Sequence, residues 1–260
     1  MRMPARVLFS LGIILSAHQA RAGDWTLTLG AQGVSAPVFE GAKAREFRFS
    51  PMIAIGRQGK EQRFSSRNDS PSIALIETGA VRAGVAGRLI RGRDAGTSSD
   101  LAGLSDVKFG GELGGFVDVY PTESIRVRGE VRQGIRSHDG LVADIAADGF
   151  ADLAPDLRLS GGPRARYATS GYSQAYYGVN ASEAAASGLS QYDPDGGWQS
   201  VGVGTALTWS ATDKLETSAF AEYKRLVGPA GDSSLVRERG SANQLLLGVS
   251  ATYKFGVSLN

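Results

Sequence analysis

The sequence predicts an all-β protein of the outer membrane, an antiparallel transmembrane β-barrel of twelve strands, with ten as the alternative count. Three observations predict it. A secretory signal opens the chain, segments of about ten residues alternate apolar with small or polar residues, and short and long connections follow one another. Short periplasmic turns and long extracellular loops are typical of such barrels.

Residues 1–22 have the composition of a secretory signal peptide. Arg2 and Arg6 precede an apolar run at residues 7–17, and Ala20-Arg21-Ala22 forms a small-residue cleavage site. The run of about eleven residues is too short to cross a bilayer, which requires roughly 20. We therefore expect a signal peptide at residues 1–22 and one barrel domain at residues 23–260, because no linker or composition break divides the rest.

Removal of the signal changes the net charge. It takes away three arginines and no acidic residue, so the 28 basic residues of the whole chain fall to 25, against 26 acidic ones. A nearly neutral chain without a Lys/Arg cluster or an aromatic RNA-binding motif gives no support to nucleic acid as a partner. The chain has no cysteine, so disulfides and thiolate metal sites are impossible.

Period-two alternation marks each predicted strand in turn. Along the chain the strands are marked by residues 25–32, 47–55, 62–66, 72–76, 81–89, 113–119, 125–131, 141–147, 157–167, 201–209, 215–223 and 245–255. The predicted barrel has twelve strands if residues 62–66 and 72–76 form two short strands, and ten if they do not. Either number is even, as a single-chain barrel with both termini in the periplasm requires.

The connections and aromatic residues favour a barrel over a secreted β-sandwich. Breaks at 77–80, 121–124, 154–156 and 211–214 are short, whereas those at 91–107, 170–198 and 227–242 are long. The expected aromatic girdles consist of Trp25, Trp209, Tyr253 and Phe255 at the turn end, with Tyr167 and Tyr223 at the loop end. A sandwich would bury large apolar residues between its two sheets. Here the apolar set of alternate strand residues includes several alanines, and the opposite set carries charges.

Three consecutive strands carry a basic, an acidic and a basic column on the phase assigned to the lumen. These candidate lumen charges are Arg126, Arg128 and Arg132; Asp144, Asp148 and Asp152; and Arg158, Arg164 and Arg166. Opposite charges on neighbouring strands can pair. They would form either an ion-pair ladder that fills the lumen and fixes the register, or a polarised constriction that orients small ions or zwitterions. Pairing neutralises the field that a selective pore needs, which favours the ladder.

Candidate catalytic and metal-binding residues are few. His138 is the only histidine left after the signal is removed, and it lies in Ser137-His138-Asp139-Gly140, a typical turn sequence. No nucleophile motif marks a serine partner, so we interpret His138 as a solvated turn residue. One histidine without cysteine excludes the usual zinc sets, and Asp-Pro-Asp-Gly-Gly at residues 193–197 lacks EF-hand spacing. We predict no enzyme, no metal and no cofactor.

Several short motifs recur in a specific order and spacing. They are Pro-Val-Phe-Glu-Gly at 37–41, Leu-Ala-Gly-Leu-Ser-Asp at 101–106, Tyr-Tyr-Gly-Val at 176–179, Ser-Gly-Leu at 187–189, Tyr-Asp-Pro-Asp-Gly-Gly at 192–197, Tyr-Lys-Arg-Leu at 223–226, and Gly-Ser-Ala-Asn-Gln at 240–244 leading to Tyr-Lys-Phe at 253–255. From about residue 25 to residue 255 the chain thereby resembles the MipA/OmpV family of outer-membrane proteins. It departs from the family in Ser-Ser-Leu-Val at 233–236, where Ser-Pro is usual before an aliphatic pair.

The resemblance implies a non-enzymatic scaffold in the cell outer membrane. In one branch of the family, such a scaffold brings a murein hydrolase and a penicillin-binding murein synthase together at the inner side of that membrane, whereas other members are surface antigens or porin-like proteins. The expected partners are therefore outer-membrane lipid, a murein hydrolase and a penicillin-binding protein. The charged inward phase supports the alternative, a porin-like channel for small polar solutes. An enzyme acting on lipid or cell wall would depend on His138 alone.

Overall fold

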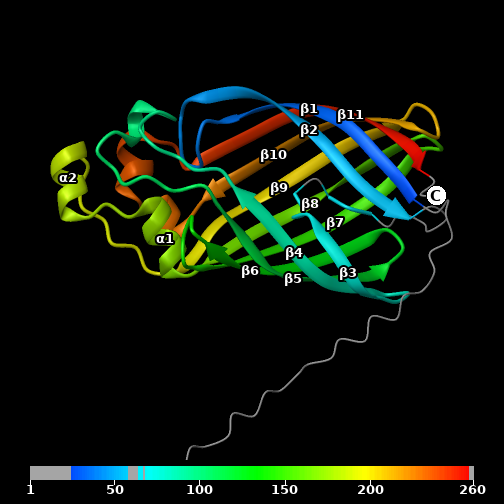
Figure 1. Ribbon diagram of the computed structural model, residues 1–260, viewed down its shortest axis with the longest axis horizontal. Helices are drawn as coiled ribbons and strands as arrows, with labels where there is room; N and C mark the ends of the chain where they lie inside the picture. The colour runs from blue at the N-terminus through cyan, green and yellow to red at the C-terminus, as the bar shows by residue number, and fades with distance from the viewer. Residues whose placement is uncertain (1–24, 58–63, 67, 258–260) are drawn as a thin grey trace, which may run out of the picture.

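The computed structural model describes residues 25–57, 64–66 and 68–257, which form one antiparallel sheet of eleven strands (Figure 1). The strands are β1 (Trp25–Pro37), β2 (Arg45–Arg57), β3 (Ser72–Glu77), β4 (Val81–Ile90), β5 (Gly110–Thr122), β6 (Ile125–Ile135), β7 (Leu141–Ala154), β8 (Leu157–Ala168), β9 (Gly197–Ser210), β10 (Leu215–Leu226) and β11 (Asn243–Val257). The all-β class and the antiparallel arrangement are confirmed. The proposed signal at residues 1–22 lies outside the described residues.

The sheet closes most of its circle through β1, which pairs with both β2 and β11. All ten pairings among the described strands are antiparallel, so β2 and β3, at the two ends of the sheet, run in the same direction. Figure 1 shows the sheet rolled so that these two ends come to the same side. In the predicted strand at 62–66, residues 62 and 63 lie outside the described part, and residues 64–66 form no strand. The count of twelve stays a prediction.

Strand β6 shows the character of the wall. Exposed and buried residues alternate strictly along it. The exposed residues include Ile125, Val127 and Val131, whereas the buried ones include Arg126 and Arg132. Charged side chains are almost never fully buried in soluble proteins unless they are paired, and apolar ones are usually inside. The reversed pattern fits a wall with lipid outside and a polar interior.

The outward face carries aromatic residues near both ends of the strands. Trp209, Tyr253 and Phe255 are exposed at the turn end, and Tyr167 and Tyr223 are exposed at the loop end. The side chain of Trp25 lies outside the described part. Aromatic girdles of this kind sit at the two membrane interfaces. In the described residues, no helix has the length and apolar character that spanning a membrane would take.

The long connections pack against one another at the end of the sheet opposite the label of the C-terminus (Figure 1). They contain α1 (Ser170–Tyr177), α2 (Ala181–Ser187), α3 (Gly228–Gly231), a 3-10 turn η1 (Ser99–Leu101) and a π-helical turn η2 (Leu235–Arg239). One apolar cluster includes Tyr172, Tyr177 and Leu226, and a second includes Phe39 and Leu101. We call this packed set of connections the outer cap.

Candidate functional site

The inward side chains of β5 to β8 form one ion-pair network. Seven of the nine predicted lumen charges belong to it, namely Arg126, Arg128, Arg132, Asp144, Asp148, Arg164 and Arg166. The other two, Asp152 and Arg158, pair with each other at 2.6 Å with 58% and 44% of their side-chain surface exposed. The structure therefore brings seven of the candidates together and leaves this exposed pair apart.

Arg126 is fully buried and has carboxylates on two sides. Its Nη2 donates to Oδ2 of Asp148, the residue opposite it on β7, at 2.5 Å. Its Nη1 and Nη2 also donate to the two carboxylate oxygens of Asp69, at 2.5 and 2.9 Å. Arg164 on β8 donates to the second oxygen of Asp148. Burying these charges is costly, and the multiple charge-assisted hydrogen bonds offset that cost.

Arg132 connects three strands nearer the loop end. From β6 it donates to Glu112 on β5 at 2.7 Å and to Asp144 on β7 at 2.6 Å, and it also bonds Glu130 on its own strand. Arg166 on β8 donates to Asp144 at 2.8 Å. Every strand of this part of the wall is thus connected to the next by at least one ion pair.

Sequence reasoning missed five acidic members of the network. Arg128 pairs not with the aspartate column but with Asp118 on β5 at 3.1 Å and with Glu130 at 3.0 Å. The inward phase of β5 and β6 could have identified Glu112, Asp118 and Glu130, since they alternate with apolar residues such as Leu113 and Val117. No local signal marked the other two, Asp69 and Glu40, because both lie in connections rather than strands.

The chain before β3 crosses the interior of the barrel. Phe64 stacks on Phe150 with ring centroids 4.6 Å apart, and Ser66 accepts a hydrogen bond from Arg164 at 3.1 Å. Asn68 donates to Glu222 on β10, and its backbone carbonyl accepts from Arg88 on β4 at 3.2 Å. With Asp69 bound to Arg126, this lumen segment (residues 64–66 and 68–70) contacts strands on opposite sides of the wall. The lumen segment therefore lies inside the barrel and does not add a strand to its wall.

Glu40 connects the outer cap to the wall. Its Oε1 accepts from Lys224 on β10 at 2.6 Å, and its Oε2 lies 3.3 Å from the hydroxyl of Tyr172 on α1, which donates to it, and 3.6 Å from Arg166. Burial raises the pKa of Glu40, but the positive charges of Lys224 and Arg166 outweigh it and bring the pKa from 4.5 down to about 2. Glu40 is thus held ionised where the first loop enters the barrel.

We expect Glu40→Gln to destabilise the outer cap in a pH-dependent way. Because the pKa is lower in the folded state, the ionised carboxylate stabilises that state above pH 4.5, and this contribution is lost as the pH falls towards about 2. In limited proteolysis, the cap of the variant should be cut faster than that of wild type. This difference in cleavage rate should be full at pH 6 and should shrink progressively below pH 4.5. Glu46→Gln, at an exposed pair with Arg48, is the control. A difference that persists unchanged at pH 2 would contradict this mechanism.

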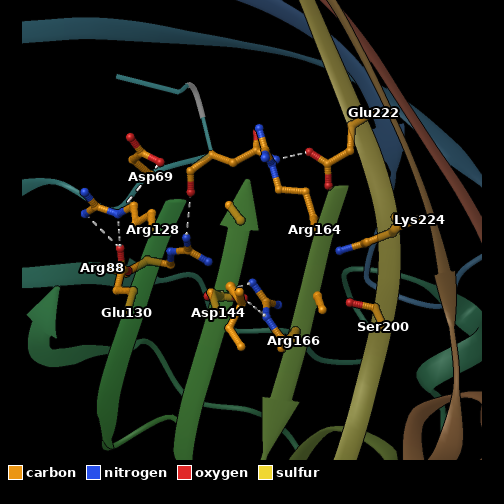
Figure 2. Close-up of a pocket in the computed structure, with 15 residues that line it drawn as sticks. Asp69, Arg88, Arg128, Glu130, Asp144, Arg164, Arg166, Ser200, Glu222 and Lys224 are labelled. Atoms are coloured by element: carbon orange, nitrogen blue, oxygen red, sulfur yellow. Dashed lines mark hydrogen bonds and ion pairs between the residues drawn. The ribbon is translucent and has the colours of Figure 1, made fainter. Parts of the chain in front are cut away.

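A cavity of about 70 Å³ lies between the lumen segment and the inner faces of β4 and β6 to β10. Figure 2 shows its charged lining, with Arg88 and Arg128 on one side and Glu222 and Lys224 on the other. By the usual allowance of roughly 10–15 Å³ per water in this measure, it holds about five waters. It is a small chamber bordered by the network.

His138 is buried, which corrects the interpretation of a solvated turn residue. Its Nε2 lies 3.1 Å from Glu112, and its ring packs edge-on against Tyr172 with centroids 5.0 Å apart. Packing of α1 over the turn buries the ring, and the local turn sequence gave no sign of it. The hydroxyl of Ser137 makes no hydrogen bond to the ring in the described part.

The described residues contain no cluster of three or more histidines, cysteines or acidic residues suited to a metal ion. Asp193, in the Asp-Pro-Asp-Gly-Gly stretch, accepts a hydrogen bond from Gln174 at 3.3 Å. Within the ion-pair network, by contrast, each carboxylate has a guanidinium or ammonium partner.

A rolled antiparallel sheet, with apolar residues outward and charges buried inward, defines this chain as a β-barrel protein of the outer membrane. The model of one family, described as MltA-interacting protein MipA, matches residues 29–255. The chain belongs to that family, as the motifs in its loops predicted. A comparison with curated proteins gave no significant match.

Solved structures similar to this chain include several outer-membrane proteins. Pseudomonas putida OprB has a TM-score of 0.45 at 10% identity, over 90% of this chain and 94% of that chain. The NanC porin has a TM-score of 0.44 at 10% identity, over 87% and 100% of the two chains. The outer-membrane channel DcaP of Acinetobacter baumannii has a TM-score of 0.42 at 7% identity, over 90% and 96%.

Proposed function

We propose that this chain is a non-enzymatic scaffold of the outer membrane that binds a murein hydrolase and a penicillin-binding murein synthase at its periplasmic end. The observation that carries the proposal is the filled lumen. The lumen segment bonds Arg126 and Glu222 across the interior, and the ion-pair network occupies the space beside it. A barrel without an open path acts through its surfaces, and the family description names an interaction with a murein enzyme.

The same proposal includes the processing and closure of the barrel. Residues 1–22 act as a cleaved signal peptide, and the barrel domain begins at residue 23. The edges β2 and β3 run in the same direction, so one further strand between them would be antiparallel to both; the described residues 64–66 and 68–70 do not form that strand. Such a strand would complete a closed barrel of twelve, the even number that this class of barrel uses.

The absence of catalysis is supported by the environment of His138. The only histidine of the mature chain has a side chain with no exposed surface, and its Nε2 faces Glu112. A general base must reach the proton it removes, directly or through one water. With its Nε2 engaged by Glu112 and its ring covered by α1, His138 is suited to packing and not to hydrolysis.

The scaffold can be tested by cross-linking, since the chain has no cysteine of its own. A photoreactive probe on Asp213→Cys would report the turn end, and the same probe on Ala185→Cys would report the outer cap; both positions are exposed. We expect a murein hydrolase to be cross-linked in envelope extracts from position 213 and not from position 185. Failure to recover any murein enzyme from either position, or recovery from position 185 alone, would overturn the scaffold.

The channel for small polar solutes is the competing function, and a bilayer recording separates the two. Because the lumen segment crosses the interior, we expect purified wild-type protein to give no conductance above that of the empty membrane. A steady conductance would remove the observation on which the scaffold depends and favour the channel.

A further inference from the structure

The lumen cavity carries a surplus of positive charge. Among the described residues, five basic and four acidic side chains line it, a formal excess of one positive charge. Solvent reaches it, since Lys224 and Asp144 keep 28% and 27% of their side-chain surface accessible. A chamber of this kind attracts a small anion more than a cation.

Two guanidinium groups at the cavity have unused donors. Arg88 forms no ion pair within the described residues, and its one hydrogen bond goes to the backbone carbonyl of Asn68. Arg164 bonds Asp148 and Ser66 through Nη2, but its buried Nε has no partner. A buried donor without an acceptor destabilises the folded state. A ligand that supplied acceptors here would offset part of that effect.

The acidic residues at the cavity are already satisfied. Asp69 is held by Arg126, Asp144 by Arg132 and Arg166, and Glu222 accepts from Asn68. The unfilled hydrogen-bonding capacity is therefore on the donor side. We propose that this cavity is a binding site for a small monocarboxylate, held by Arg88 and by Nε of Arg164.

The size and shape of the chamber agree with this class of ligand. Acetate has four heavy atoms, and the cavity has room for about five waters. The planar guanidinium fork of arginine matches the two oxygens of a carboxylate better than it matches a spherical ion. The site lies beside the lumen segment (Figure 2) and is independent of the scaffold role, because it uses the interior and not the periplasmic surface.

Titration calorimetry of the full chain in detergent, with sodium acetate as the probe and constant ionic strength, tests the site. We expect saturable binding to wild type, at least tenfold weaker binding to Arg88→Gln, and unchanged binding to the control Arg158→Gln. Arg88 suits the test because its removal leaves no carboxylate unpaired, so the fold is retained. Arg88→Lys, which keeps the charge but loses the fork, should bind with intermediate affinity.

Three results would overturn the carboxylate site. They are no saturable heat with wild type, equal acetate affinity in wild type and Arg88→Gln, and binding of ethylammonium as tight as that of acetate. If Arg88→Gln failed to give the folded barrel in a gel-mobility assay, the acetate affinities of Arg88→Lys and wild type would be compared instead. Equal affinities in these two proteins would then overturn the site. Cross-linking to a murein enzyme is a separate measurement. A negative result for acetate binding therefore does not contradict the scaffold function, and a negative cross-linking result does not contradict the carboxylate site.

Discussion

Replacing Arg132 with methionine is expected to lower the free energy of unfolding by about 3–5 kcal/mol, the cost of leaving a buried charge without its partner. Arg132 is fully buried and bonds three carboxylates, those of Glu112, Glu130 and Asp144. Methionine fills similar space but provides no donor, so these carboxylates would face one another in the interior. Urea unfolding of the barrel refolded in detergent would measure the loss.

Arg158→Met is the matched control for this prediction. It removes the same side chain from the same predicted set of lumen charges, but Arg158 is exposed and pairs with one exposed partner, Asp152. Exposed ion pairs contribute little to stability, so this variant should unfold close to wild type. Equal losses for the two variants would mean that the buried network does not stabilise the wall.

The wall of the barrel could be predicted from the sequence because its pattern is local. Side chains along a strand point to the same face at every second residue. The charged face of β6 and the apolar face of β9 can therefore both be recognised from the sequence. The pairing of Arg126 with Asp148 then follows from adjacent antiparallel strands. Asp152 and Arg158 also pair across adjacent strands, but they are exposed and stand apart from the buried network, a difference that the alternation does not predict.

The interior contents could not be predicted in the same way. Asp69 binds Arg126 from 57 positions away, and Glu40 binds Lys224 from 184 positions away, without any periodic signal in between. The helices of the outer cap were also missed. For α2 a signal existed, since Asn180 and Glu183 form a capping box and Gly188 ends the helix at a positive φ of 77°. For α1 no comparable signal precedes Ser170, and Thr169 makes no side-chain cap bond.

Two layers lie over the interior, and different contacts hold each of them. The lumen segment is held by side chains of the wall, such as Arg126 and Arg164. The outer cap is held mainly by apolar packing around Tyr172 and Tyr177, with Glu40 as its polar link to the wall. A variant that loosens one layer should therefore leave the other in place.

Tyr177→Ala is expected to weaken the outer cap by about 3–5 kcal/mol, the usual cost of truncating a fully buried aromatic side chain. Tyr177 is 1% exposed at the end of α1, where it packs in one cluster with Leu226, Ala230 and Val236. The ends of β7, β8 and β10 contribute Val142, Ala168 and Leu226 to this cluster, but we expect the strands to keep their own hydrogen-bonded pairings. Limited proteolysis should therefore cut residues 170–196 in the variant while the strands stay protected. Tyr167→Ala, which truncates an aromatic on the outward face, should leave the cap resistant.

The same variant also separates the two layers in a bilayer recording. Tyr177→Ala opens the cap but leaves the bonds of Asp69 and Asn68 in the lumen, so it should remain as silent as wild type. Conductance that appeared on loosening the cap alone would mean that the lumen segment does not block the interior. In that case the cap would be the gate of a channel, and the filled lumen could no longer support the scaffold.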